Sequence, residues 1–193
     1  GTVFGAVGTC GQRCTSTRRL IVHEKVYDKV KNSLVKAYNQ IKIGNPLDSN
    51  IHVGPLIDLD AVKSYEKALY QIKKEGGRFL IKGGVLSGKE YISGCYVKPA
   101  IAEVNHSLKI VHTETFAPIL YLIKYSGDIE NAIEIQNEVD QGLSSSVMTN
   151  SLKDAEVFLS HWGSDCGIAN VNIGTSGAEL SLIHISEPTR PMN

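Results

Sequence analysis

The 193-residue sequence lacks the features that mark several large classes of protein. Lys and Arg together number 20, as do Asp and Glu, so the formal charge is zero. Proteins that act mainly by neutralising phosphates carry a basic excess, so we expect no nucleic-acid partner. Apolar residues are 42% and charged residues 21%, ordinary globular values that argue against intrinsic disorder.

Long apolar runs are also missing. No stretch approaches the ~20 apolar residues of a membrane span, so we expect no association with a membrane. The first residues, Gly1 to Gly5, contain neither Met nor the positive charge that opens a signal peptide. Because the chain starts without Met inside an apolar, Gly-rich pattern, we expect it to be cut from something longer.

Cysteine is scarce and scattered. Four cysteines are too few for a disulfide scaffold and favour a reduced intracellular protein, either cytoplasmic or mitochondrial. Cys10 and Cys14 are four residues apart, but no second close pair completes a four-cysteine zinc site. The histidines form no HExxH motif. We therefore expect no metal.

The remaining pattern alternates between strands and helices, which is typical of an α/β fold. Apolar β-branched runs predict strands, and three- and four-residue apolar steps predict helices. The predicted strands are 18–23, 79–81, 96–101, 119–125, 143–149 and 167–173, and the predicted helices are 26–41, 58–75, 128–137 and 152–162. We predict a mostly parallel sheet with helices on both faces, in one domain over residues 1–180.

Three short segments could carry chemistry. Cys14 follows a Gly turn between Arg13 and Thr15, where a positive charge and free backbone N–H groups would favour the reactive thiolate. The same cysteine could equally be an inert, buried structural residue. Glu114, just before a predicted strand, could bind ribose hydroxyls or be a solvated loop carboxylate. Residues 170–178 end a strand in a Gly/Ser/Thr loop, which could bind a carboxylate or be an ordinary turn.

Taken in order, these segments resemble the aldehyde dehydrogenase superfamily. The resemblance runs from Gly1 to Ala178 and is carried by motifs in the family's order: Gly-Gln-Arg-Cys-Thr at 11–15, Gly-Asn-Pro at 44–46, Gly-Pro-Leu at 54–56, Glu-Thr-Phe-Ala-Pro at 114–118 and Gly-Leu-Ser-Ser-Ser at 142–146. The amino-acid sequence at residues 11–15, 112–121 and 163–172 is similar to that of the antiquitin branch, which oxidises α-aminoadipic semialdehyde in lysine breakdown.

The resemblance implies a role for individual residues. Cys14 matches the family nucleophile, which forms a thiohemiacetal and then a thioester with an aldehyde substrate while NAD takes up the hydride. Glu114 and Phe116 match residues at the nicotinamide ribose. Arg13, Ser176 and Gly177 match the residues that hold the substrate's carboxylate in the antiquitin branch. The family also implies that the complete enzyme is a homotetramer.

The sequence departs from the family at both ends. The general-base Glu, a second oxyanion donor, a cofactor-binding Lys and the Gly-rich turn of the dinucleotide domain all lie, in the family, before the position matching Gly1. Residues 181–193 break the pattern and are expected to be a non-native tail such as a cloning scar. We therefore expect the 193-residue chain alone to be inactive.

Other functions remain open at this point. The chain could belong to another branch of the family with a different aldehyde, such as a CoA-acylating or glycolytic-type dehydrogenase, or it could be a non-catalytic relative. It could also be a cysteine hydrolase, which would need His23 or His112 as a base within reach of Cys14.

Overall fold

The computed structural model describes residues 1–176. The tail at 181–193 lies outside the described residues. In chain order the elements are α1 (Thr2–Val7), η1 (Gly8–Gly11), β1 (Arg19–His23), α2 (Glu24–Tyr38), α3 (Leu59–Lys74), β2 (Arg78–Ile81), β3 (Gly84–Val85), η2 (Lys89–Tyr91), β4 (Val97–Lys98), β5 (Ala100–Glu103), η3 (Lys109–His112), β6 (Ile119–Tyr125), α4 (Ile129–Asn137), β7 (Ser144–Val147), α5 (Leu152–Leu159) and β8 (Ile168–Val171).

The main sheet has four strands in the order β1-β6-β5-β2. β6 pairs in parallel with β1 on one side and with β5 on the other, and only β2 runs antiparallel. β7 and β8 form a separate parallel pair, and β3 and β4 a short antiparallel one. The predicted α/β class and mostly parallel pairing are confirmed, although the strands form three sheets within residues 1–176.

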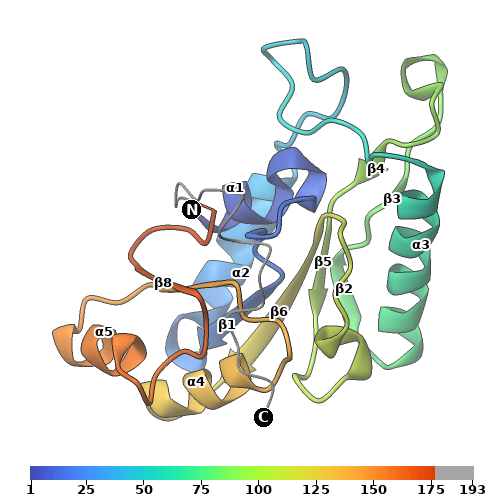
Figure 1. The fold of residues 1–193 in the computed structure, drawn as a ribbon. Coiled ribbons are helices and arrows are strands. Elements are labelled where there is room, and N and C mark those ends of the chain that lie inside the picture. Colours follow the sequence, from blue (N-terminus) through green and yellow to red (C-terminus); the bar gives the residue numbers. More distant parts are fainter. Residues whose placement is uncertain (177–193) are drawn as a thin grey trace.

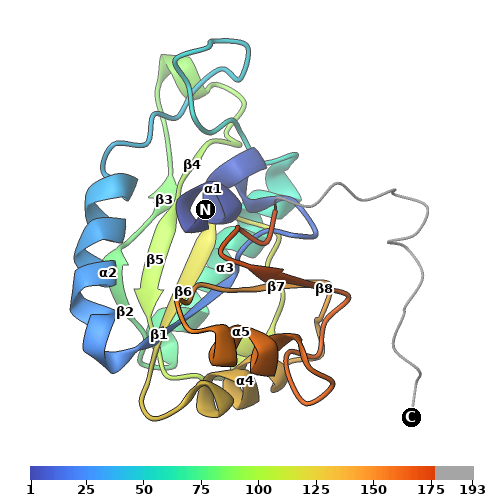
Figure 2. The ribbon, with the colours of Figure 1, turned by 90° about the vertical axis from the view of Figure 1, so that its left-hand side faces the viewer.

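The centre of the core is β6, whose first five residues are at most 2% exposed. A parallel strand covered on both faces needs such a continuous apolar run, which explains why no alternation appears there. Helices α2 and α3 lie on opposite faces of the main sheet (Figures 1 and 2). Helices α4 and α5 lie beside β7 and β8, and a second small core of Ile133, Val147 and Phe158 joins them (Figure 2).

Most helix boundaries follow local signals. The Asp58 carboxylate accepts a hydrogen bond from the Ala61 backbone N–H at 2.8 Å, which caps α3. Asp128 precedes α4 but its side chain makes no capping bond. Helix α5 ends at Leu159 instead of Trp162, because the Ser160 backbone is extended and its hydroxyl donates to the Val157 carbonyl.

Helix α2 also ends before the apolar pattern does, at Tyr38 instead of Ile41. None of the described helices is both long enough and apolar enough to cross a membrane.

Candidate active site

Cys14 lies in the loop that connects η1 to β1, and its side chain is exposed. Just before it, Thr9, Cys10 and Gly11 all have left-handed backbones, with φ of 54°, 54° and 67°. A side chain at Gly11 would place its Cβ 2.6 Å from the Ala117 carbonyl oxygen. Glycine therefore allows the backbone of the Cys14 loop to touch the backbone that leads into β6.

Arg18 holds these same two segments together. Its Nη1 donates to the carbonyls of Gly11 at 2.7 Å and Ala117 at 3.1 Å, and its Nη2 donates to the Arg13 carbonyl at 3.4 Å. The guanidinium carbon lies 4.9 Å from the centre of the Phe116 ring. Burial lowers the pKa of Arg18, and the negative charge of Glu114 opposes that shift. One side chain thus satisfies three main-chain acceptors in two separate loops.

The loop after β8 packs against the other side of the Cys14 loop. The hydroxyls of Thr175 and Ser176 each donate to the Thr15 carbonyl at 2.8 Å. A further hydroxyl pair, Thr17 and Thr175, lies 2.8 Å apart. Ser176 therefore lies against Thr15, the residue that follows Cys14 in the chain.

Cys14, Glu114 and Phe116 line one cavity of about 680 Å³, together with Arg18. This volume is within the range of small-molecule sites. The Cys14 loop and the Glu114 loop precede β1 and β6, whose parallel pairing brings both loops to the same edge of the sheet. The site therefore combines the amino ends of two strands with the carboxyl end of β8. The cavity extends along all of β1 towards β7.

Arg13 does not line this cavity. Its Nε donates to the Thr9 hydroxyl at 2.8 Å, and its guanidinium lies 5.3 Å from the centre of the exposed Phe4 ring. Its two Nη groups make no hydrogen bond within residues 1–176. The structure thus brings Cys14, Glu114 and Phe116 to one cavity. Ser176 bonds to Thr15 beside that cavity, and Arg13 faces Phe4 of α1. Gly177 lies outside the described residues.

Comparison with known proteins decides the family. The model of the aldehyde dehydrogenase family matches residues 1–184. The chain belongs to the aldehyde dehydrogenase family. The α-aminoadipic semialdehyde dehydrogenase of Bos taurus is 50% identical over 179 residues, covering 92% of this chain and 32% of that protein. Aldehyde dehydrogenase family 7 member A1 of Brassica napus is 46% identical over 178 residues, covering 92% of this chain and 35% of that protein.

Solved aldehyde dehydrogenases have the same fold. Lactaldehyde dehydrogenase from Escherichia coli superposes with a TM-score of 0.82 at 31% identity, covering 92% of this chain and 36% of that one. Aldehyde dehydrogenase 21 from Physcomitrella patens, in complex with succinate, gives a TM-score of 0.80 at 30% identity and covers 91% of this chain and 34% of that one. The chain thus spans about a third of the length of the relatives it matches.

Within this family member, the two neighbouring cysteines differ sharply. Cys10 is 1% exposed, and burial raises the pKa of its thiol to about 12. Cys14 is exposed, so the interpretation of Cys14 as a buried structural cysteine is wrong; Cys10 has that role.

Neither histidine proposed as a hydrolase base bonds to the Cys14 sulfur. The His23 ring bonds to the Gly127 carbonyl at 3.2 Å and caps α2. His112 bonds to the His106 carbonyl at 2.7 Å. The geometry therefore gives no cysteine–histidine pair for a hydrolase within residues 1–176.

Sequence reasoning missed Arg18. Its contacts are with backbone carbonyls, which leave no pattern in the side-chain sequence. The only available signal was a charged residue directly before an apolar strand, and charged residues are common there.

Proposed function

We propose that this chain carries the nucleophile of an aldehyde dehydrogenase, Cys14, which oxidises an aldehyde to a carboxylic acid. The observation that carries the proposal is the shared cavity: an exposed cysteine lines the same space as Glu114 and Phe116. Two findings support the same reaction: the chain belongs to the aldehyde dehydrogenase family, and it is 50% identical over 179 residues to the α-aminoadipic semialdehyde dehydrogenase of Bos taurus.

The chemistry follows from a thiolate beside a cavity. The Cys14 thiol loses its proton, and the sulfur forms a bond with the aldehyde carbon while the carbonyl electrons move to oxygen. The Cys14 backbone N–H would stabilise this oxyanion, a contribution of roughly 3–4 kcal/mol where such donors have been removed. When a hydride leaves the former aldehyde carbon, the oxyanion electrons re-form the carbonyl and leave a thioester on Cys14. Water then attacks this thioester, which releases the carboxylic acid and restores the thiol.

The residues present fit a nicotinamide cofactor, and we propose NAD. When bound, NAD would supply the acceptor for the hydride that leaves the thiohemiacetal carbon. No hydrogen bond within residues 1–176 engages the Glu114 carboxylate, so it can accept from ribose hydroxyls. Phe116 is 44% exposed and has Arg18 at its ring, so part of this apolar surface is open to a ligand.

For the substrate we propose a semialdehyde with a distal carboxylate, α-aminoadipic semialdehyde. The two unengaged Nη groups of Arg13 present the fork that matches two carboxylate oxygens. Ser176 sits beside Cys14 and, with Gly177, would complete the carboxylate site. In the complete enzyme we propose a homotetramer, as the family resemblance implies.

The test uses a chimera, because we propose that further parts of the enzyme are needed for turnover. Residues 1–178 replace the matching segment of the Bos taurus enzyme, and NADH formation is followed with aminoadipic semialdehyde. We expect turnover from the chimera, none from its Cys14→Ala variant, and none from the 193-residue chain alone. A chimera that folds but remains inactive would overturn the proposed function, as would equal activity in Cys14→Ala. Activity of the isolated chain would overturn only the need for further parts.

A further inference from the structure

Arg18 is a half-buried cation that the proposed reaction does not use directly, and its hydrogen-bond acceptors are unusual for a charged side chain. Within residues 1–176, the three hydrogen bonds of its side chain all go to main-chain carbonyls: those of Gly11 and Arg13 on either side of Gln12, and that of Ala117 just before β6. The carbonyls of Gly11 and Ala117 share one nitrogen, Nη1, so the two backbones cannot separate without breaking a bond to it.

The planar guanidinium suits this position better than other cations would. Arginine presents five N–H donors in a fixed plane, whereas lysine presents a compact ammonium on a flexible stem. The same plane lies 4.9 Å from the centre of the Phe116 ring, so Arg18 contacts the side chain as well as the backbone of that loop. The Glu114 carboxylate is close enough to raise the pKa of Arg18 against the effect of burial.

We propose that Arg18 is a positioning residue, which fixes the Cys14 loop against the Glu114–Phe116 loop through these contacts. The inference rests on the proposed function. Attack by the thiolate on an aldehyde needs Cys14 alone. Departure of the hydride also needs Glu114 and Phe116, the proposed cofactor residues, at the correct distance from Cys14. Loss of Arg18 should therefore impair turnover far more than it impairs the intrinsic reactivity of the thiol.

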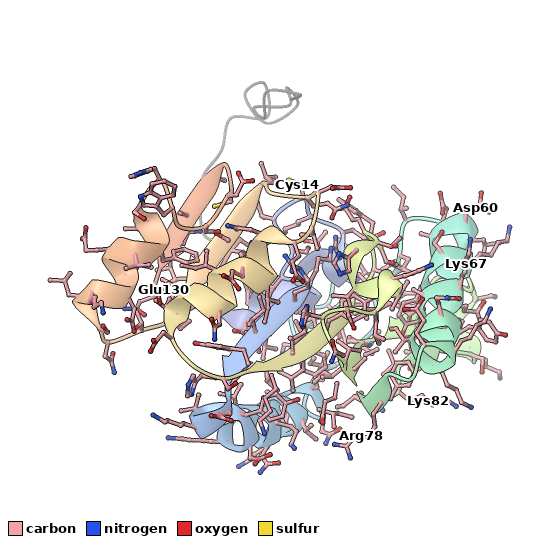
Figure 3. All side chains as sticks on the ribbon, turned by 90° about the horizontal axis from the view of Figure 1, so that it is seen from below. Cys14, Asp60, Lys67, Arg78, Lys82 and Glu130 are labelled. Atoms are coloured by element: carbon pink, nitrogen blue, oxygen red, sulfur yellow. The ribbon has the colours of Figure 1, made fainter. Side chains whose placement is uncertain are left out.

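The first experiment uses the 193-residue chain and measures amide hydrogen exchange by mass spectrometry. We expect Arg18→Gln to raise exchange by about tenfold in residues 9–16 and 114–118, with β5 and β6 unchanged, because local opening is separate from global unfolding. Arg18→Lys should give a smaller increase. Arg78→Gln is the control: the Arg78 guanidinium donates two hydrogen bonds, both to the Glu103 carboxylate, and Arg78 lies on the opposite side of the molecule from Cys14 (Figure 3).

The second experiment places the same substitutions in the chimera. We expect Arg18→Gln to lower kcat by about tenfold or more, since small misplacements of reacting groups cost up to about 100-fold. The KM for aldehyde should stay within about threefold, the pattern of an interaction needed after binding. Arg18→Lys should recover part of kcat, and the rate of Cys14 alkylation should change less than kcat.

Two results would overturn the inference: unchanged exchange in both loops, or an equal rise in exchange across β5 and β6, which would indicate general destabilisation. A kcat of Arg18→Gln equal to the wild-type value would also overturn it. If the unsubstituted chimera forms no NADH, the proposed function fails, and the exchange result still decides whether Arg18 holds the two loops together.

Discussion

Replacing Gly11 by alanine tests whether the close approach of two backbones shapes the site. The new Cβ would lie 2.6 Å from the Ala117 carbonyl oxygen and 2.8 Å from the Pro118 nitrogen, both main-chain atoms that cannot rotate away. The backbones would have to separate by about 0.8 Å to restore ordinary contact, and overpacking of this kind costs about 1–3 kcal/mol. Alanine in the left-handed region adds about 1–2 kcal/mol, partly offset by its smaller entropy in the unfolded chain.

Gly76→Ala provides the matched control. Gly76 also has a positive φ, 94°, but nothing lies within 4 Å of the position of its Cβ. Its substitution therefore reports the conformational penalty without the clash. The φ of Gly11, 67°, is closer to the favoured left-handed value than the φ of Gly76, 94°. The conformational penalty of alanine at position 76 is therefore at least as large as the penalty at position 11.

Urea unfolding of the 193-residue chain, followed by circular dichroism, measures both free energies. We expect a loss of about 1 kcal/mol for Gly76→Ala and about 2–4 kcal/mol for Gly11→Ala. Losses that agree within about 0.5 kcal/mol, the usual error of such comparisons, would refute the close approach of the two loops. Hydrogen exchange in residues 114–118 should also rise for Gly11→Ala alone, because only that substitution pushes on Ala117.

Two further predictions concern thiols and tyrosines. A short iodoacetamide pulse at pH 8 should alkylate Cys14 and leave Cys10 intact, because Cys10 is buried and its pKa is raised to about 12. Peptide mapping measures the labelling of each cysteine, and equal labelling of the two would contradict this prediction. Tyr65→Phe should cost about 1–3 kcal/mol, since its hydroxyl donates to the Lys98 carbonyl, whereas Tyr121→Phe should be neutral or stabilising, because that buried hydroxyl has no partner in the described chain. Urea unfolding of both variants checks the difference, and a larger loss for Tyr121→Phe would count against it.

Local elements of the fold could be predicted from the sequence because their signals are local. The apolar run of β6 and the Asp58 cap of α3 each lie within a few residues of the feature they specify. Pairing is different: Arg19 of β1 lies beside Tyr121 of β6, about a hundred positions along the chain, and no pattern in either strand names its partner. The division into three sheets was therefore outside the reach of periodicity.

The residues of the candidate site also differ in how far the sequence could predict them. Cys14, Glu114 and Ser176 were predicted because reactive and polar side chains recur in ordered motifs. Arg18 and Gly11 were missed in their roles, because both act on main-chain atoms of Ala117, more than ninety positions away. Every residue has a backbone carbonyl, so a contact with the Ala117 carbonyl does not require any particular side chain at that position. The sequence around Ala117 therefore gives no indication that Arg18 or Gly11 contacts it.

This division has a consequence for how the site tolerates change. The loops are held by Arg18, by the backbone contact at Gly11 and by the hydroxyls of Thr175 and Ser176, none of which bonds to the Cys14 sulfur. The Cys14 sulfur and the Glu114 carboxylate are left without structural hydrogen bonds within residues 1–176. Substitution of Cys14 or Glu114 should therefore abolish or reduce the proposed activity and leave the loop structure unchanged. Substitution of the residues that hold the loops should instead shift the loops and lower the activity without abolishing it. The Cys14 thiol stays exposed in this arrangement because other residues make the contacts that hold its loop in place.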